Sequence, residues 1–181
     1  LIPDFDSFPA FADPLNGGID FGTSVSHAYD SRSVFTNPAA LAYQTELNDS
    51  GLITSYNYGI TRDSRSQIAM SLAYGYLGAG WEKLASGFDD FSRFSLSAGM
   101  PLSHVLFLGT RVAFSSSEVP ALSGVTGFDL GVQYRPLSMV SFGVMINRLN
   151  RPMSMGVQLP SHWVAGFTTR PIKRIELSFD I

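Results

Sequence analysis

The sequence predicts an all-β fold, an antiparallel transmembrane β-barrel or most of one, with a short N-terminal helix as a plug or latch. Three observations favour this fold class. Prolines recur at a fixed spacing late in the chain, apolar residues alternate with small or polar residues over long stretches, and charged residues are scarce. Together they predict hairpins of strands that cross a bilayer.

The repeat is marked by Pro101, Pro136 and Pro171, which are spaced 35 residues apart. Each proline follows an alternating run and precedes Leu or Ile, two mostly polar residues and a second run. A fixed period indicates a repeated unit, here a strand, a tight turn, a returning strand and a longer loop. Bacterial barrels have short periplasmic turns and longer extracellular loops, so the three prolines are expected in periplasmic turns.

Alternation is clear after the first of these prolines. Leu106, Leu108, Val112 and Phe114 share one predicted face, and the residues between them are mostly small or polar. The runs have about 9–11 residues, enough for a tilted strand to cross a bilayer. A soluble β-sandwich that acts as a binding module would alternate too and is a lesser alternative. A polar face rich in Gly, Ser and Ala suits a crowded or water-lined lumen better than a solvent surface.

Composition agrees with a membrane barrel. Charged residues make up 15% of the 181 residues and aromatic residues 13%, whereas a soluble domain usually has about 25% charged residues. The formal net charge of -3 predicts no binding to nucleic acid. The chain has no Cys, so neither disulfides nor thiolate metal sites can form. We expect no metal site and no cofactor.

Aromatic side chains gather near the ends of the expected strands, where the interfaces of a bilayer would lie. Simple β-propensity is the alternative reason for aromatic residues in strands. The residues concerned are Tyr56, Tyr58, Tyr74, Tyr76, Trp81, Phe91, Tyr134 and Trp163.

Residues 1–50 are expected on the periplasmic side or inside the lumen. Residues 1–16 are rich in Pro, Asp and Phe and predict an extended segment, and 17–25 could be a short strand or part of a hatch. Thr36 or Asn37 can cap a helix with Pro38 at its first position. This helix is expected to end near Gln44 and to act as a plug, although an ordinary helical turn is an alternative.

Residues 51–181 are expected to form the hairpins of an incomplete barrel. An odd number of strands conflicts with the even number found in bacterial single-chain barrels, and an open edge is not tolerated in lipid. Residues 17–25 could supply a strand, another chain could complete the sheet, or the chain could be a fragment of a longer one. The nine expected strands are 51–60, 67–73, 77–84, 92–100, 104–115, 126–135, 139–147, 162–170 and 173–181.

The run Asn37-Pro38-Ala39-Ala40-Leu41-Ala42 resembles a signature near the N-terminus of a superfamily of outer-membrane barrels. This superfamily includes the long-chain fatty-acid transporters (FadL-like) and the PorV-like barrels of type IX secretion. The resemblance implies the outer membrane of a Gram-negative bacterium, contact with outer-membrane lipid, possible further subunits of a membrane complex, and a plug motif at Asn37, Pro38, Ala39, Ala40 and Leu41. Residues 129–181 also resemble barrel segments fused ahead of protease domains of the signal-peptide-peptidase type.

Six charged residues fall on the predicted polar face, where they would pair across the lumen or line a polar path. They are Glu82, Arg111, Asp129, Arg135, Glu176 and Asp180. His27, His104 and His162 lie on different segments with no Ser or carboxylate in a defined arrangement, so no catalytic triad is predicted. We expect the chain not to be an enzyme.

Two functions of different classes follow. In the first, which the resemblance favours, the barrel is a channel for hydrophobic molecules or a barrel subunit of an export machine. In the second, the barrel is a non-transporting scaffold that anchors a partner or a fused domain in the outer membrane. A lumen blocked by side chains and the helix would favour the scaffold, and a continuous apolar pocket would favour the channel.

Overall fold

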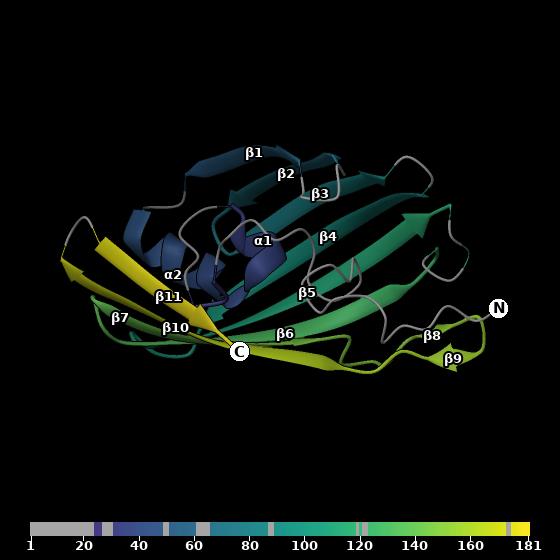
Figure 1. Ribbon diagram of the computed structural model, residues 1–181. Helices are drawn as coiled ribbons and strands as arrows, with labels where there is room; N and C mark the ends of the chain where they lie inside the picture. The colour runs from purple at the N-terminus through teal and green to yellow at the C-terminus, as the bar shows by residue number, and fades with distance from the viewer. Residues whose placement is uncertain are drawn as a thin grey trace.

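The computed structural model describes residues 24–26, 31–48, 51–60, 66–86, 89–118, 120, 123–172 and 175–181 (Figure 1). The expected extended segment 1–16 and most of the possible strand 17–25 lie outside these residues. Of that possible strand only Ser24 and Val25 are described, and neither of them lies in a strand.

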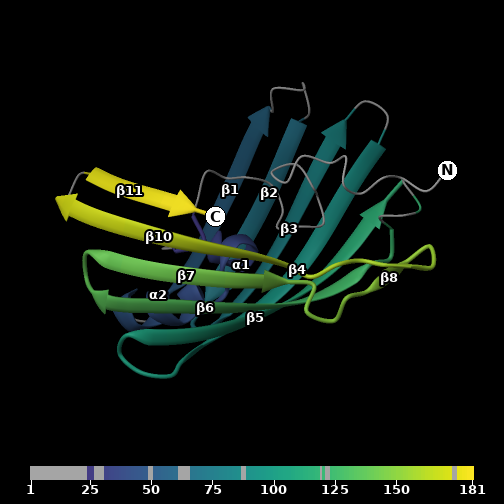
Figure 2. The same cartoon turned by 60° about the horizontal axis from the view of Figure 1, so that its bottom comes forward.

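The described chain is dominated by one antiparallel sheet of nine strands, which confirms the all-β fold class. Each long strand pairs with the long strands that come before and after it in the chain. The sheet is therefore a continuous series of hairpins (Figure 2). Each expected strand corresponds to one observed strand. They are β1 (Leu52–Ile60), β2 (Ser66–Tyr74), β3 (Leu77–Ser86), β4 (Asp89–Pro101), β5 (Leu106–Ser117), β6 (Thr126–Leu137), β7 (Val140–Asn147), β10 (His162–Ile172) and β11 (Ile175–Asp180).

A small hairpin stands apart from this sheet. β8 (Met153–Ser154) pairs with β9 (Val157–Gln158) within the long connection between β7 and β10, where the sequence predicts only a loop. Gly156 between them has a φ of 82°, which favours glycine over other residues.

The prediction that the three prolines lie in turns is wrong. Pro101 is the last residue of β4, and Pro136 and Pro171 lie inside β6 and β10, one residue before each strand ends. The register shifts between Tyr134 and Leu137, and again between Thr169 and Ile172. Proline has no N–H to donate, so it is accommodated at strand ends and at such bulges. Their periplasmic location stays a prediction.

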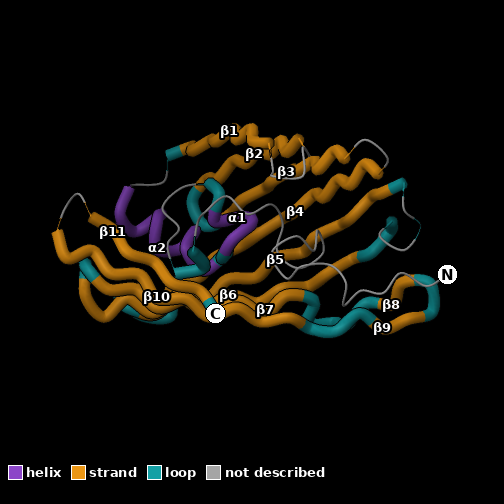
Figure 3. Tube along the Cα trace, in the orientation of Figure 1, coloured by secondary structure: helices purple, strands orange, loops and turns teal. Residues whose placement is uncertain are grey.

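Two helices precede the strands, α1 (Ser33–Thr36) and α2 (Ala39–Asn48). Between them Asn37 adopts an extended backbone, φ -154° and ψ 104°, as expected for a residue before proline. α2 runs past its expected end at Gln44, because the helix formers Glu46 and Leu47 follow and the run of turn-forming residues begins only at Asn48. Both helices lie against the concave side of the sheet (Figures 1 and 3).

We call the helix-covered side of the sheet the inner face and the opposite side the outer face. Along β5, Gly109, Arg111 and Ala113 on the inner face are buried, whereas Thr110 and Phe114 on the outer face are exposed. The alternation therefore matches the predicted one. Large apolar side chains exposed on the outer face include Met70, Leu72, Phe94, Leu96, Phe114, Phe128, Phe142 and Val144.

Most of the aromatic side chains noted in the sequence are exposed, as the interface prediction requires. The exposed ones are Tyr56, Tyr74, Tyr76, Tyr134 and Trp163. Phe91 contradicts the prediction of an interface position. It lies on the inner face, buried in a cluster with Val125 and Leu159, because its position in β4 has the same parity as the buried Arg93.

Candidate functional site

The start of α2 rests directly on the sheet backbone. Gly99, Gly109 and Gly131 lie side by side on β4, β5 and β6. A Cβ atom at Gly99 would lie 2.7 Å from the backbone nitrogen of Ala42, and one at Gly109 would overlap the backbone of residues 38–39. We call these three residues the glycine row. Only glycine allows so close an approach of two backbones, so the row fixes where the helix can lie.

Asn37 joins three parts of the chain. Its side-chain oxygen accepts a hydrogen bond from the backbone nitrogen of Ala39 at 3.1 Å, which caps the beginning of α2. Its amide nitrogen donates to the carbonyl oxygens of Val25 at 2.8 Å and of Val132 at 3.2 Å. The side chain is fully buried. Asn37 thus ties the helix to β6 and to the described segment 24–26.

The rest of the predicted plug motif is buried as well. Pro38, Ala39, Ala40 and Leu41 have almost no solvent exposure. Leu41 belongs to an apolar cluster with Val34, Phe35, Ala69 and Ala73, which connects both helices to β2. The sequence motif is therefore buried throughout and packs closely on the sheet.

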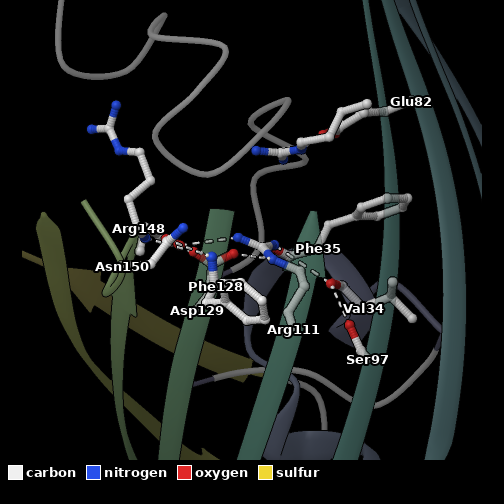
Figure 4. A network of polar contacts seen from close by, with 11 residues as sticks. Val34, Phe35, Glu82, Ser97, Arg111, Phe128, Asp129, Arg148 and Asn150 are labelled. Atoms are coloured by element: carbon white, nitrogen blue, oxygen red, sulfur yellow. Dashed lines mark hydrogen bonds and ion pairs between the residues drawn. The ribbon is translucent and has the colours of Figure 1, made fainter. Parts of the chain in front are cut away.

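Arg111 and Asp129 form a buried ion pair beneath α1 (Figure 4). They are direct cross-strand partners on β5 and β6, with 2.6 Å between Nε and Oδ2. The guanidinium also donates to the carbonyl oxygen of Phe35 and, at 3.0 Å, to the side chain of Asn147. The last carbonyl groups of a helix lack partners within it, so Arg111 supplies donors where α1 ends.

A second buried pair lies near the first. Glu82 on β3 and Arg93 on β4 are direct cross-strand partners, and the Nε atom of Arg93 contacts the carboxylate of Glu82. Both side chains are at most 3% exposed. By contrast, Lys83 and Asp90 form an exposed pair at 2.5 Å. Glu82 is predicted on the polar face from the sequence and Arg93 is not, although Arg93 shares the parity of the small residues Ser95 and Ser97.

The other predicted charged residues lie elsewhere on the inner side. Arg135 stacks over the ring of Tyr43, with 3.8 Å from the guanidinium carbon to the ring centroid, and Tyr43 packs edge-on against Phe107. Asp180 accepts hydrogen bonds from the hydroxyl of Ser24 and, at 3.2 Å, from the backbone nitrogen of Val25. The side chain of Glu176 lies outside the described residues. The five of these side chains that the structure describes therefore do not form one cluster.

Hydroxyl groups hold the segment 24–26 over the other half of the sheet. The hydroxyl of Ser26 bonds that of Thr168 at 2.6 Å. The carbonyl oxygen of Ser26 accepts from Gln133 at 3.0 Å and from Ser141 at 2.7 Å. The small polar residues at every second position are the only sequence signal for this site.

A cavity of about 20 Å³ remains next to the two ion pairs, which is room for about one water molecule. Its lining includes Arg93, Ser115, Asp129 and Arg148. In the described residues no group of His, Asp and Glu is arranged to hold a metal ion. The geometry is that of a tightly occupied inner face, in which the polar groups bind neighbouring parts of the same chain.

Comparisons with protein-family models, curated proteins and solved structures gave no match to this chain. Within the described ranges, no helix combines the length and the apolar character needed to cross a membrane. The function is therefore inferred from the two faces of the sheet and from what covers each of them.

Proposed function

We propose that this chain forms most of the wall of an outer-membrane β-barrel, with α1 and α2 as a plug in its lumen. The observation that carries the proposal is the inverted distribution of polarity. Charged and polar side chains are buried on the inner face, while large apolar side chains are exposed on the outer face. A sheet in water buries its apolar face, whereas a membrane barrel turns that face to lipid.

Size and length support the same proposal. The exposed apolar side chains extend over adjacent strands from β2 to β7, and soluble monomers rarely expose contiguous apolar patches larger than a few hundred Å². β4, β5 and β6 have 13, 12 and 12 residues. They are thus long enough to cross a bilayer, for which a tilted strand needs about 9–11 residues. Exposed Tyr and Trp side chains near strand ends, such as Tyr74 and Trp163, suit the bilayer interfaces.

The role that the inner face supports best is that of a barrel with an occluded lumen, which serves as a scaffold or anchor in a membrane complex. The glycine row, Arg111 and Asn37 all hold the helices against the sheet. The space left beside the ion pairs is no larger than a water molecule. These features suit a plug that stays in place.

A channel for hydrophobic molecules is the second candidate. It is favoured by the resemblance of Asn37 to Ala42 to the signature of the fatty-acid transporters and the PorV-like barrels. This function would require α1 and α2 to leave the positions that they hold here, which means breaking the bond of Asn37 to Val132 of β6 and the bond of Arg111 to Phe35 of α1.

An arginine scan of the outer face tests the membrane proposal. Leu96 lies on the outer face in β4, and Leu102 lies in the turn after it, both about half exposed at 47% and 53%. In a barrel, Leu96→Arg should lower the unfolding free energy in lipid vesicles by about 2–4 kcal/mol and Leu102→Arg by about 0–1 kcal/mol. Urea unfolding followed by tryptophan fluorescence measures both.

The comparison of Leu96→Arg with Leu102→Arg distinguishes a barrel from a soluble sheet. In a soluble β-sandwich both leucines are surface residues, and both substitutions would change stability by no more than about 0.5 kcal/mol. Equal, small effects, together with a protein that stays in solution without detergent, would contradict the barrel.

A further inference from the structure

The two edges of the nine-stranded sheet, β1 and β11, define a seam. In the part of the chain that is described, each of them pairs on one side only. Both keep the alternation of the other strands, with Tyr56 and Phe179 exposed on the outer face and Ser55 and Ser178 on the other. The sheet curves so that both edges come round toward the side of the helices (Figure 1).

The number of strands fixes the relative direction of the two edges. Every neighbouring pair in the sheet is antiparallel. With nine strands in the series, the first and the last point the same way. If β1 paired directly with β11, the seam would therefore be parallel, in a class of barrels whose strands are antiparallel and even in number.

Pairing between copies of this sheet does not remove the parallel seam. In any ring of copies, each seam joins β11 of one copy to β1 of the next, and every such seam is parallel. An antiparallel pair of two β1 strands needs a two-fold axis perpendicular to the sheet. In a barrel wall this axis lies in the membrane plane, so the two copies would be inserted in opposite directions.

The interior also needs a wider ring. An eight-stranded barrel has an interior just wide enough for side chains or one small ligand, whereas a helix with its side chains is about 10–12 Å across. Here α2 lies over β4, β5 and β6 and α1 over β3. A ring that holds both helices requires strands beyond the nine described.

We propose that the seam between β1 and β11 binds an odd number of additional antiparallel β-strands, contributed by polypeptide other than the described strands or a copy of them. This inference rests on the proposed membrane function, because lipid leaves the N–H and C=O groups of an open edge without partners. The added strands carry apolar residues on the outer face. On the inner face they carry small or hydroxyl residues that continue the chains of hydroxyl bonds next to each edge.

These chains of hydroxyl bonds set the chemistry of the partner. At one edge Ser55 bonds Ser31 at 2.7 Å and Ser71 at 2.8 Å. At the other edge Ser178 bonds Thr168 at 2.9 Å. A small polar side chain on the next strand would continue the hydroxyl bonds of each serine, which a large apolar one cannot do.

Photocrosslinking at the two edges tests the proposal in the membrane in which the protein is made. The variants are Tyr56→p-benzoylphenylalanine in β1 and Phe179→p-benzoylphenylalanine in β11, which keep an aromatic ring on the outer face. Both should capture peptides that map outside the described strands. Phe114→p-benzoylphenylalanine in the middle of the sheet is the control and should capture β4 or β6, its two neighbours.

Three results would overturn the inference while leaving the membrane proposal intact. They are capture of β11 by the β1 variant, capture of a second copy at either edge, and capture of lipid alone at both edges.

A disulfide pair checks direct pairing of β1 with β11 independently, since the chain has no Cys of its own. Ser55→Cys with Ser178→Cys should stay reduced, whereas Ser55→Cys with the cross-strand partner Ser71→Cys should oxidise. Oxidation of the first pair would overturn the inference.

Discussion

The outer and inner faces of the sheet are built from alternating residues of the same strands, yet they follow opposite rules. On the outer face Leu96 and Phe114 are 47% and 45% exposed. On the inner face Glu82 and Arg111 are 1% and 2% exposed. Charge is thus found where solvent is excluded, and large apolar side chains are found where the surface is open.

The difference shows what stabilises each face. Polar groups on the inner face are buried with partners from the same chain, so their contribution depends on each hydrogen bond and each close contact being made. The outer face has few such contacts, and its stability depends on the solvent that surrounds it. Substitutions at adjacent residues should therefore have very different effects.

The largest effect is expected for a buried charge that loses its partner. Arg111→Met leaves Asp129 buried without its guanidinium and removes the donors to Phe35 and Asn147. Breaking a buried pair in this way costs about 3–5 kcal/mol. Urea unfolding of the purified protein in detergent micelles should show this loss of unfolding free energy.

Two controls separate burial from charge itself. The double variant Arg111→Met with Asp129→Leu should recover part of the loss, because no unpaired charge remains. Recovery will be incomplete, since Asp129 also accepts a hydrogen bond from the backbone nitrogen of Arg148 at 2.7 Å. Asp90→Asn, which breaks the exposed pair with Lys83, should cost less than about 1 kcal/mol. Similar losses for Arg111→Met and Asp90→Asn would refute the distinction.

The next effect compares two adjacent residues of β5, Gly109 on the inner face and Thr110 on the outer face. Gly109→Val places a side chain where the backbone of residues 38–39 lies, so the helix must shift. Overpacking of this kind costs about 1–3 kcal/mol and occasionally more. If α2 plugs a lumen, the same variant should also raise ion conductance across planar bilayers.

Thr110→Val is the matched control. It places the same β-branched valine at the adjacent, exposed position, where a β-branched side chain already stands, so it should change the unfolding free energy by no more than about 0.5 kcal/mol. Conductance should not change. A Gly109→Val variant as stable and as closed as Thr110→Val would show that the glycine row does not position the helix.

The strands were predictable because their signal is local. A period of two in residues such as Val112, Ala113 and Phe114 fixes both the strand and its faces without knowledge of the rest of the chain. The prolines were misplaced because the bulges that accommodate Pro136 and Pro171 depend on the register with the next strand, which the sequence of one strand does not contain.

The contacts of the inner face were harder to predict for the same reason. The partner of Glu82 is Arg93 only because the hairpin register places them opposite each other. Asn37 was predicted as a helix cap, but its bond to the carbonyl oxygen of Val132 joins residues distant in sequence. Residue type and parity can nominate such side chains, and only the fold decides which of them meet.

The smallest effect compares Thr168 and Thr169, adjacent residues of β10 that face opposite sides. Thr168 is 2% exposed, and its hydroxyl bonds Ser26 at 2.6 Å and Ser178 at 2.9 Å. Thr168→Val keeps the shape and removes the hydroxyl from both bonds, which should cost about 1–2 kcal/mol of unfolding free energy in micelles. Thr169, whose cross-strand partners are Val140 and Leu177, faces the outer side. Thr169→Val should therefore be neutral or slightly stabilising, and a loss as large as that of Thr168→Val would mean that the outer face is not in an apolar environment.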